Sequence, residues 1–187
     1  FYEYFRLCET IGAKPLPVLP AGMSCQNTSQ GPVPVAQEDM PAYIDEVLGL
    51  IDFCNAHGIR SYVLSGGFTH FTHAIATRLG MTGDFSNMLG IDAERGVLTG
   101  TVTGPAGGRI LDADGKRRTL EILCHQAGAT LEQAIAAGDG ANDLEMIGAA
   151  ALGIAYHAKP VVRAQARLAV TASGLDAITL LFIEAWR

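Results

Sequence analysis

The chain has 187 residues, of which 49% are hydrophobic and 17% are charged, as in an ordinary globular domain. Its formal net charge is −6 without a run of Lys or Arg, so nucleic acid and anionic membrane surfaces are not expected partners. The four cysteines form no C-x-x-C pair, which disfavours a zinc site or disulfide framework and favours a reducing cytoplasm. Neither an export signal nor a membrane span is expected from the apolar pattern. The chain begins at Phe1, as a fragment or a processed product would.

The first 35 residues differ in character from the rest of the chain. Prolines at positions 15, 17 and 20 exclude a central strand, because proline cannot donate to a β-ladder. The polar run that follows is typical of a loop or a linker. We therefore predict an irregular Pro/Ser-rich segment over residues 1–35 and one core domain over residues 36–187.

The next part of the chain predicts a helix, a strand and a second helix, the order in which a parallel sheet is built. Asp39 is a suitable cap for the first helix, and Gly58 ends it. The apolar run 59–64 predicts the strand, and residues 68–79 predict the next helix. Between them, Ser65-Gly66-Gly67 offers a hydroxyl and backbone N–H groups that suit an anion, although a plain strand-to-helix turn is an equal alternative.

The middle of the chain predicts irregular β structure over residues 84–111, with an alternating strand over 97–104. Asp112-Ala113-Asp114-Gly115 predicts a turn, because Asp-Gly is a frequent turn dipeptide. A helix is then expected from Lys116 to Gly128. A lysine at the start of a helix opposes the helix dipole, so Lys116 is either an exposed side chain or the partner of a nearby anion.

The stretch Gly138-Asp139-Gly140-Ala141-Asn142-Asp143 carries the strongest chemical signal in the sequence. It follows an uncharged run, 133–137, that predicts a buried strand, and it precedes a short predicted helix over 144–150. Open α/β sheets place their ligands at such strand ends. Two carboxylates and an amide between glycines suit a hard cation with oxygen ligands. The alternative, in which Asp143 only caps the next helix, leaves the second carboxylate and the amide unexplained.

The remainder of the chain continues the α/β alternation. Strands are predicted over 152–156 and 168–170, with a helix opened by Pro160 and a closing amphipathic helix over 174–186. Together, the elements predict an α/β fold: a Rossmann-like parallel sheet with helices on both faces.

Three stretches resemble the haloacid dehalogenase superfamily, and within it the phosphoserine phosphatases. Leu64-Ser65-Gly66-Gly67-Phe68-Thr69 resembles the second motif of the family. The run from Leu98 to Lys116 resembles the approach to its third-motif lysine. The turn 138–143, with the strand after it and His157-Ala158-Lys159-Pro160, resembles the fourth motif. The resemblance implies a haloacid dehalogenase-like fold for the core.

The resemblance also implies a role for each motif residue. The implied set is Asp139 as the Mg²⁺ ligand, Asp143 as support for the metal site, Ser65, the Gly66 amide and Asn142 as phosphate contacts, and Lys116 as the neutralising charge. Such a set suits phosphoryl transfer, which depends mainly on positioning and on neutralising phosphate oxygens. The implied reaction is the Mg²⁺-dependent hydrolysis of O-phosphoserine to serine and phosphate.

The sequence departs from the family at the nucleophile. Family members attack phosphate with the first aspartate of a D-x-D-x-[T/S/V] motif, which lies on the central strand upstream of the serine motif. Here no aspartate precedes Asp39, and Asp112-x-Asp114 lies after the serine motif with the wrong following residue. We therefore identify no nucleophile. We also predict that the sheet is open, or closed up, between the strands that end at Leu64 and Ala137.

The missing motif leaves three hypotheses. The chain is a phosphoserine phosphatase-like polypeptide that is fragmentary or inactive alone, a non-catalytic relative that binds phosphate and Mg²⁺, or a phosphatase or phosphotransferase for another small phosphomonoester. The cap helices of the family have no counterpart here, so the substrate rests on overall likeness. A G-D-G-x-N-D turn also occurs in cation-pumping P-type ATPases, but those need membrane helices that this sequence does not predict.

Overall fold

The computed structural model describes residue 38 and residues 40–182. The predicted segment 1–35, the cap Asp39 and the last part of the predicted closing helix, 183–186, lie outside the described residues. The α-helices are α2 (Met40–Ala56), α3 (Thr69–Leu79), α4 (Ala113–Gln126), α5 (Leu144–Ala149) and α6 (Pro160–Arg163). Short 3₁₀ helices are η1 (Pro105–Gly107), η2 (Leu131–Gln133), η3 (Ala141–Asp143) and η4 (Leu175–Phe182).

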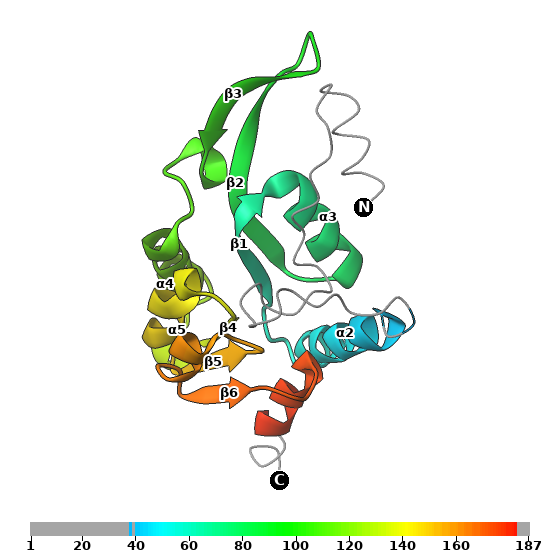
Figure 1. The fold of residues 1–187 in the computed structure, drawn as a ribbon, viewed down its shortest axis with the longest axis vertical. Helices are drawn as coiled ribbons and strands as arrows, with labels where there is room; N and C mark the ends of the chain where they lie inside the picture. The colour runs from blue at the N-terminus through cyan, green and yellow to red at the C-terminus, as the bar shows by residue number, and fades with distance from the viewer. Residues whose placement is uncertain (1–37, 39, 183–187) are drawn as a thin grey trace.

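The described strands form two three-stranded sheets (Figure 1). They are β1 (Tyr62–Phe68), β2 (Gly83–Asp92), β3 (Val97–Thr103), β4 (Ile135–Gly138), β5 (Leu152–Tyr156) and β6 (Leu168–Val170). In the first sheet, β1 is parallel to β2, and β2 turns back into an antiparallel hairpin with β3 that projects from the molecule (Figure 1). In the second sheet, β4, β5 and β6 are all parallel.

No ladder joins β1 to β4 within residues 40–182, although each of these strands leads into one of the glycine-rich motifs. Two outcomes were predicted for the strands that end at Leu64 and Ala137, an open sheet or closed-up strands, and the open one is present in this part of the chain. Side chains connect the two sheets instead, because Leu64 packs against a buried cluster formed by Ala134, Ala136, Met146 and Ala150. Burial alternates along β4, where Ala136 is 5% exposed and Ile135 is 38% exposed, whereas strands of a fully covered parallel sheet are buried on both faces.

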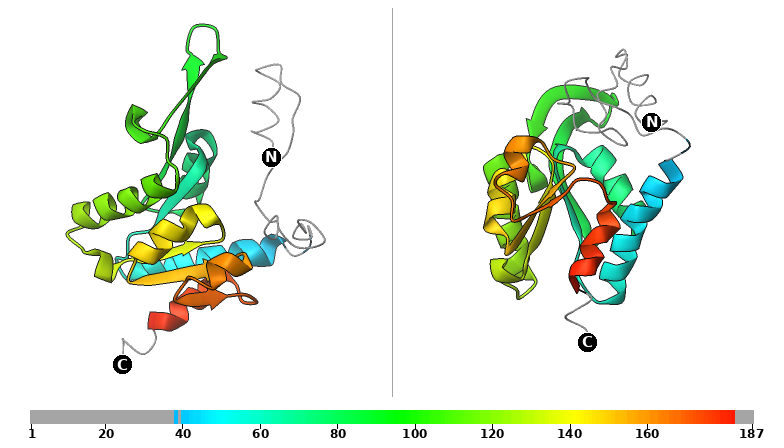
Figure 2. Two further views of the ribbon diagram at one scale, coloured as in Figure 1. Left: turned by 60° about the vertical axis from the view of Figure 1, so that its left-hand side comes forward. Right: turned by 60° about the horizontal axis from the view of Figure 1, so that its bottom comes forward.

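Helices lie on both sides of the strands, as predicted (Figure 2). Helices α4 and α5 cover one side, while α2, α3 and η4 cover the other. Helix α2 packs on η4, where the side chains of Ile51, Cys54 and Ile178 are buried and the rings of Phe53 and Phe182 lie 5.3 Å apart. Across the part of the chain that the structure describes, no helix is both long and apolar enough to cross a membrane.

Two local predictions near α4 and η4 were wrong, and a third, at Ser65-Gly66-Gly67, is described with the site. The Asp112–Gly115 stretch is the cap and first turn of α4, not a separate turn, since the Asp112 side chain accepts a hydrogen bond from the Gly115 N–H at 2.8 Å. A turn and a helix cap both use a hydrogen bond from a backbone N–H to an Asp side chain, so the local sequence pattern does not distinguish between them. The predicted closing helix is a 3₁₀ helix, η4, as far as it is described.

Candidate functional site

The turn after β4 is organised around the carboxylate of Asp143. Its Oδ2 atom accepts hydrogen bonds from the backbone N–H groups of Asp139 at 3.2 Å and Gly140 at 3.1 Å. Its own N–H donates to the Gly140 carbonyl at 3.0 Å. These bonds close the turn and pair donors that a tight turn otherwise leaves unpaired. Asp143 makes no side-chain capping bond to α5, so its side chain shapes the turn and does not cap the helix.

Lys116 reaches this turn from α4. Its Nζ atom donates to Asp143 Oδ1 at 2.6 Å, and the two side chains are only 7% and 6% exposed. Removing either member of a buried ion pair leaves the other charge without a partner and away from water, so such a pair is strongly maintained. The exposed-lysine alternative for Lys116 is therefore wrong. The anion near the start of α4 is Asp143.

Gly138 allows the Asp143 side chain to lie directly against the end of β4. A Cβ atom at position 138 would lie 2.5 Å from Asp143 Cβ and 2.7 Å from Asp143 Oδ2, which is closer than such atoms approach. The space that a side chain at 138 would fill is thus the space that the carboxylate occupies.

The Ser65-Gly66-Gly67 motif forms a bulge within β1, not a turn after it. The pairing of β1 with β2 jumps from Ser65 to Phe68, so the two glycines between them have no ladder partner. The Ser65 Oγ atom accepts a hydrogen bond from the Gly67 N–H at 3.1 Å. A bulge re-aims the side chains beside it, which gives the serine a fixed direction next to two accessible peptide groups.

Asn87 on β2 is a site residue that the sequence did not reveal. Its Nδ2 atom donates to the Gly66 carbonyl at 2.9 Å, and its Oδ1 atom accepts from the Leu111 N–H at 2.7 Å. Leu111 directly precedes the segment that opens α4. The only sequence signal was a polar residue inside a β-forming run, which carries no information about these distant partners.

The structure brings part of the predicted set together. Lys116 contacts Asp143 directly. The Asn87 side chain connects Gly66 to Leu111, the residue before the cap of α4. Ser65 is not joined by a hydrogen bond to the other predicted residues within the described chain, since its hydroxyl is bonded in its own bulge. The site therefore consists of two hydrogen-bonded parts, one at the β1 bulge and one at the turn after β4, which meet along the start of α4.

Asp139 and Asn142 are the exposed polar side chains of the turn. Both oxygens of Asp143 are already used, one by Lys116 and one by backbone N–H groups. Within residues 40–182, no group of three or more His, Cys, Asp or Glu could hold a metal ion alone. Mg²⁺ often binds proteins through one or two carboxylates and keeps several waters. The exposed Asp139 carboxylate fits such a site, with Asp143 holding the turn in shape.

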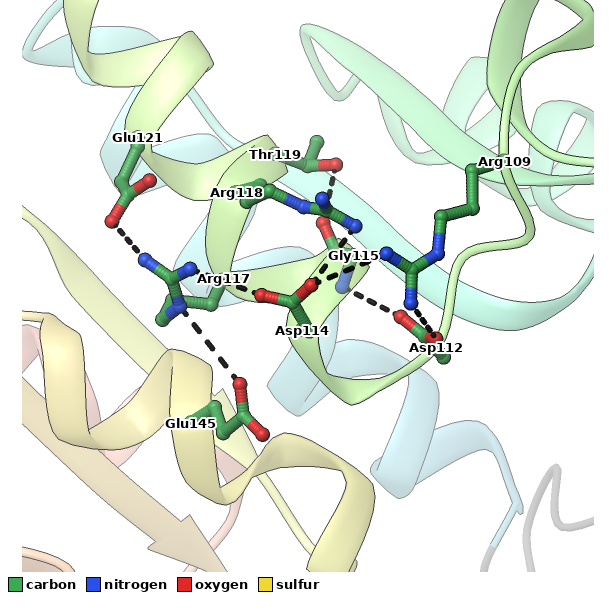
Figure 3. A network of polar contacts seen from close by, with 9 residues as sticks. All are labelled: Arg109, Asp112, Asp114, Gly115, Arg117, Arg118, Thr119, Glu121 and Glu145. Carbon is green, nitrogen blue, oxygen red and sulfur yellow. Dashed lines mark hydrogen bonds and ion pairs between the residues drawn. The ribbon is translucent and has the colours of Figure 1, made fainter.

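The acidic residues at the start of α4 belong to a surface ion-pair network (Figure 3). Asp114 pairs with Arg109, Arg117 and Arg118. The hydrogen bond from the Gly115 N–H lowers the pKa of the Asp112 carboxyl below its usual value. Both carboxylates therefore form their bonds at the N-terminus of α4, the helix that carries the buried lysine. Negative charge at a helix N-terminus also interacts favourably with the helix dipole.

Comparisons with known proteins agree on one family. Residues 30–148 match the haloacid dehalogenase-like hydrolases. The phosphoserine phosphatase of Albidiferax ferrireducens is 45% identical over 133 residues, which cover 71% of this chain and 55% of that protein. The phosphoserine phosphatase of a Polaromonas species is 46% identical over 127 residues, covering 68% of this chain and 53% of that protein. The chain thus spans about half the length of these curated relatives.

A solved structure shows the same relationship. The crystal structure of a probable phosphoserine phosphatase from Vibrio cholerae superposes with a TM-score of 0.64 and 39% sequence identity. The superposition covers 70% of this chain and 38% of that one. The family match covers more than half of the chain, and the α/β arrangement is that of the relatives. This chain therefore belongs to the haloacid dehalogenase-like hydrolases, and the relatives it is similar to are phosphoserine phosphatases.

Proposed function

We propose that this chain forms the phosphate-holding and Mg²⁺-binding part of a phosphoserine phosphatase, with O-phosphoserine as its ligand. The buried pair of Lys116 and Asp143 carries the proposal, since it holds a cation from α4 against the turn after β4. The names of the relatives support the choice of ligand. The two exposed polar side chains of the turn support the presence of a ligand site at this position.

Each residue has a defined task in this proposal. The Ser65 hydroxyl, the Gly66 N–H and the Asn142 amide donate hydrogen bonds to phosphate oxygens, and Lys116 offsets their negative charge. Phosphoryl transfer depends on such positioning and neutralisation. Groups that are held in place before the ligand arrives bind more tightly, because less ordering is needed on binding. Mg²⁺ held by Asp139 would supply further positive charge beside the phosphate.

The proposal assigns no attacking group to this polypeptide. The 187-residue sequence contains no D-x-D-x-[T/S/V] motif, and the Asp112 and Asp114 carboxylates are engaged at the start of α4. Attack on phosphorus therefore needs a nucleophile that these residues do not contain. The chain by itself binds the ligand without cleaving it.

The purified chain is expected to bind O-phosphoserine without releasing phosphate. With Mg²⁺ present, free phosphate measured by a colorimetric assay should stay at the level of a sample without protein. The ³¹P resonance of O-phosphoserine should broaden and shift as the chain is added. Ser65→Ala should weaken this binding about tenfold, because a hydrogen bond to a charged group is lost.

Ser173→Ala, which removes the hydroxyl of another exposed serine, is the control and should leave the ³¹P titration unchanged. Phosphate release that Asp139→Asn abolishes would contradict the missing nucleophile. A resonance that does not respond to the chain would contradict the binding site. A response to other small phosphomonoesters but not to O-phosphoserine would replace the proposed ligand.

Asp139→Asn is expected to weaken Mg²⁺ binding at least about tenfold, because the site depends on one charged oxygen ligand from the protein. Isothermal titration of the chain with Mg²⁺ in the presence of inorganic phosphate measures this affinity. Asp52→Asn, which changes an exposed carboxylate on α2, is the matched control and should have no effect. Equal Mg²⁺ affinities for the two variants would show that Asp139 is not the ligand.

A further inference from the structure

The bulge in β1 has little restraint of its own. Between Ser65 and Phe68 the pairing advances three residues on β1 but one on β2, so Gly66 and Gly67 lack ladder partners. Glycine has more accessible backbone conformations than any other residue, and two in succession multiply that freedom. The peptide groups in this bulge therefore need an external contact if they are to point in one direction before a ligand arrives.

The side chain of Asn87 provides that contact. Its Nδ2 atom donates to the Gly66 carbonyl at 2.9 Å, and the residue is 4% exposed. The Gly66 carbonyl and the Gly67 N–H belong to one planar peptide unit, so a bond to the first also orients the second. The Gly67 N–H in turn donates to Ser65 Oγ at 3.1 Å. One buried amide thus orients the peptide plane and, through it, the serine hydroxyl.

A side-chain amide suits this position because it must donate in one direction and accept in another. The Asn87 Oδ1 atom accepts from the Leu111 N–H at 2.7 Å, so neither end of the amide is left unpaired. A buried polar group without a partner is costly, which makes the arrangement sensitive to any change of residue type. The Asn87 carbonyl also accepts a hydrogen bond from Thr69 Oγ1 at 3.1 Å, which helps to hold the residue itself in place.

We propose that Asn87 is a positioning residue for phosphate binding, which orients the Gly66–Gly67 peptide and Ser65 relative to the helix that carries Lys116. Leu111 lies one residue before the Asp112 cap of α4, so the Asn87 amide spans directly from the bulge to the start of that helix. The role in binding rests on the proposed function. The ordering of the bulge does not, and it can be measured without a ligand.

The experiment uses two variants of the full chain. Asn87→Ala removes both hydrogen bonds, whereas Asn87→Asp has the same shape, keeps the acceptor for the Leu111 N–H and loses the donor to Gly66. Asn55→Ala and Asn55→Asp are matched controls, because Asn55 Nδ2 also donates to a glycine carbonyl, that of Gly80, at 3.1 Å on the exposed surface. The readouts are ¹⁵N relaxation of the bulge amides without ligand and the Kd for inorganic phosphate.

Both Asn87 variants are expected to increase the nanosecond motion of the Gly66 and Gly67 amides. They should also weaken phosphate binding about tenfold, the lower end of the effect of removing a group that orients a metal ligand. The Asn55 variants should match the unsubstituted chain. If Asn87→Ala does not fold, Asn87→Asp carries the test alone.

Rigid glycine amides in Asn87→Asp would overturn the proposal, because a merely structural role through Leu111 predicts that result. Mobile glycines with unchanged phosphate affinity would overturn the role in binding. A chain that binds no phosphate even without substitution would refute the proposed function, and with it the role of Asn87 in binding. The relaxation data would then still decide whether Asn87 orders the bulge.

Discussion

Replacing Lys116 by methionine is expected to destabilise the folded chain by about 3 kcal/mol. The Lys116 Nζ atom lies 2.6 Å from Asp143 Oδ1 and both side chains are nearly buried, so the variant leaves a carboxylate without its counter-charge. Methionine retains much of the apolar length of lysine, so the loss reports on charge more than on packing. Urea unfolding followed by circular dichroism should show a lower midpoint with an unchanged slope.

Two further variants distinguish the stability that is lost with the buried ion pair from the stability that is lost by removing any positive charge. Arg118→Met removes an exposed positive charge on the same helix, where the guanidinium lies 3.0 Å from Asp114, and should cost less than about 1 kcal/mol. Adding Asp143→Asn to Lys116→Met removes the unpaired charge and should recover part of the lost stability. Equal losses for Lys116→Met and Arg118→Met would contradict a strongly held buried pair.

Gly138→Ala is expected to lower stability by about 3 kcal/mol and to weaken phosphate binding as well. The added Cβ would lie 2.5 Å from Asp143 Cβ and 2.6 Å from its Cγ, so the carboxylate must move. The backbone has little freedom to yield, because Gly138 is paired with Ala155 at the end of β4. Moving the carboxylate strains its bond to Lys116. Thermal melting and the ³¹P titration measure the two effects.

Gly148→Ala provides the matched control for this substitution. It makes the same chemical change within α5, but apart from its chain neighbours and the backbone of its own helix no atom lies within 4 Å of a Cβ built at that position. Alanine is a better helix former than glycine by up to about 1 kcal/mol, so this variant should be as stable as the original chain or more stable. If the Gly138→Ala chain melts at the original temperature, contact of the Asp143 side chain with the end of β4 does not contribute to stability.

The local elements were predictable because their signals are local. The helix ending at residue 79 is closed by Gly80 with φ of 68°, a left-handed conformation that glycine adopts readily. The uncharged run before Gly138 forms β4, and the turn after it leads into α5 as its composition indicated. The wrong predictions, at Ser65-Gly66-Gly67, at Asp112 and at η4, concern the choice between two short structures with similar local patterns.

The partners across the site were not predictable in the same way. Lys116 and Asp143 are 27 residues apart in the sequence, and Asn87 is 21 residues from Gly66 and 24 from Leu111. Such pairs depend on how strands and helices pack, and the pattern near each residue carries no record of its distant partner. From the sequence, Lys116 could be either exposed to solvent or paired with an anion. Only the packing of α4 against the turn after β4 shows that it is paired with Asp143.

The sequence by itself determined the α/β class, the two glycine-rich motifs and the absence of a nucleophile motif among these 187 residues, since composition, periodicity and residue type decide such features locally. The tertiary structure decided between the two predicted outcomes for the sheet, since β1 and β4 remain unpaired within the described chain. It also decided that a buried lysine faces Asp143 and that an asparagine on β2 holds the serine bulge. Those outcomes depend on which surfaces meet when the layers pack, and burial then makes each polar partner necessary.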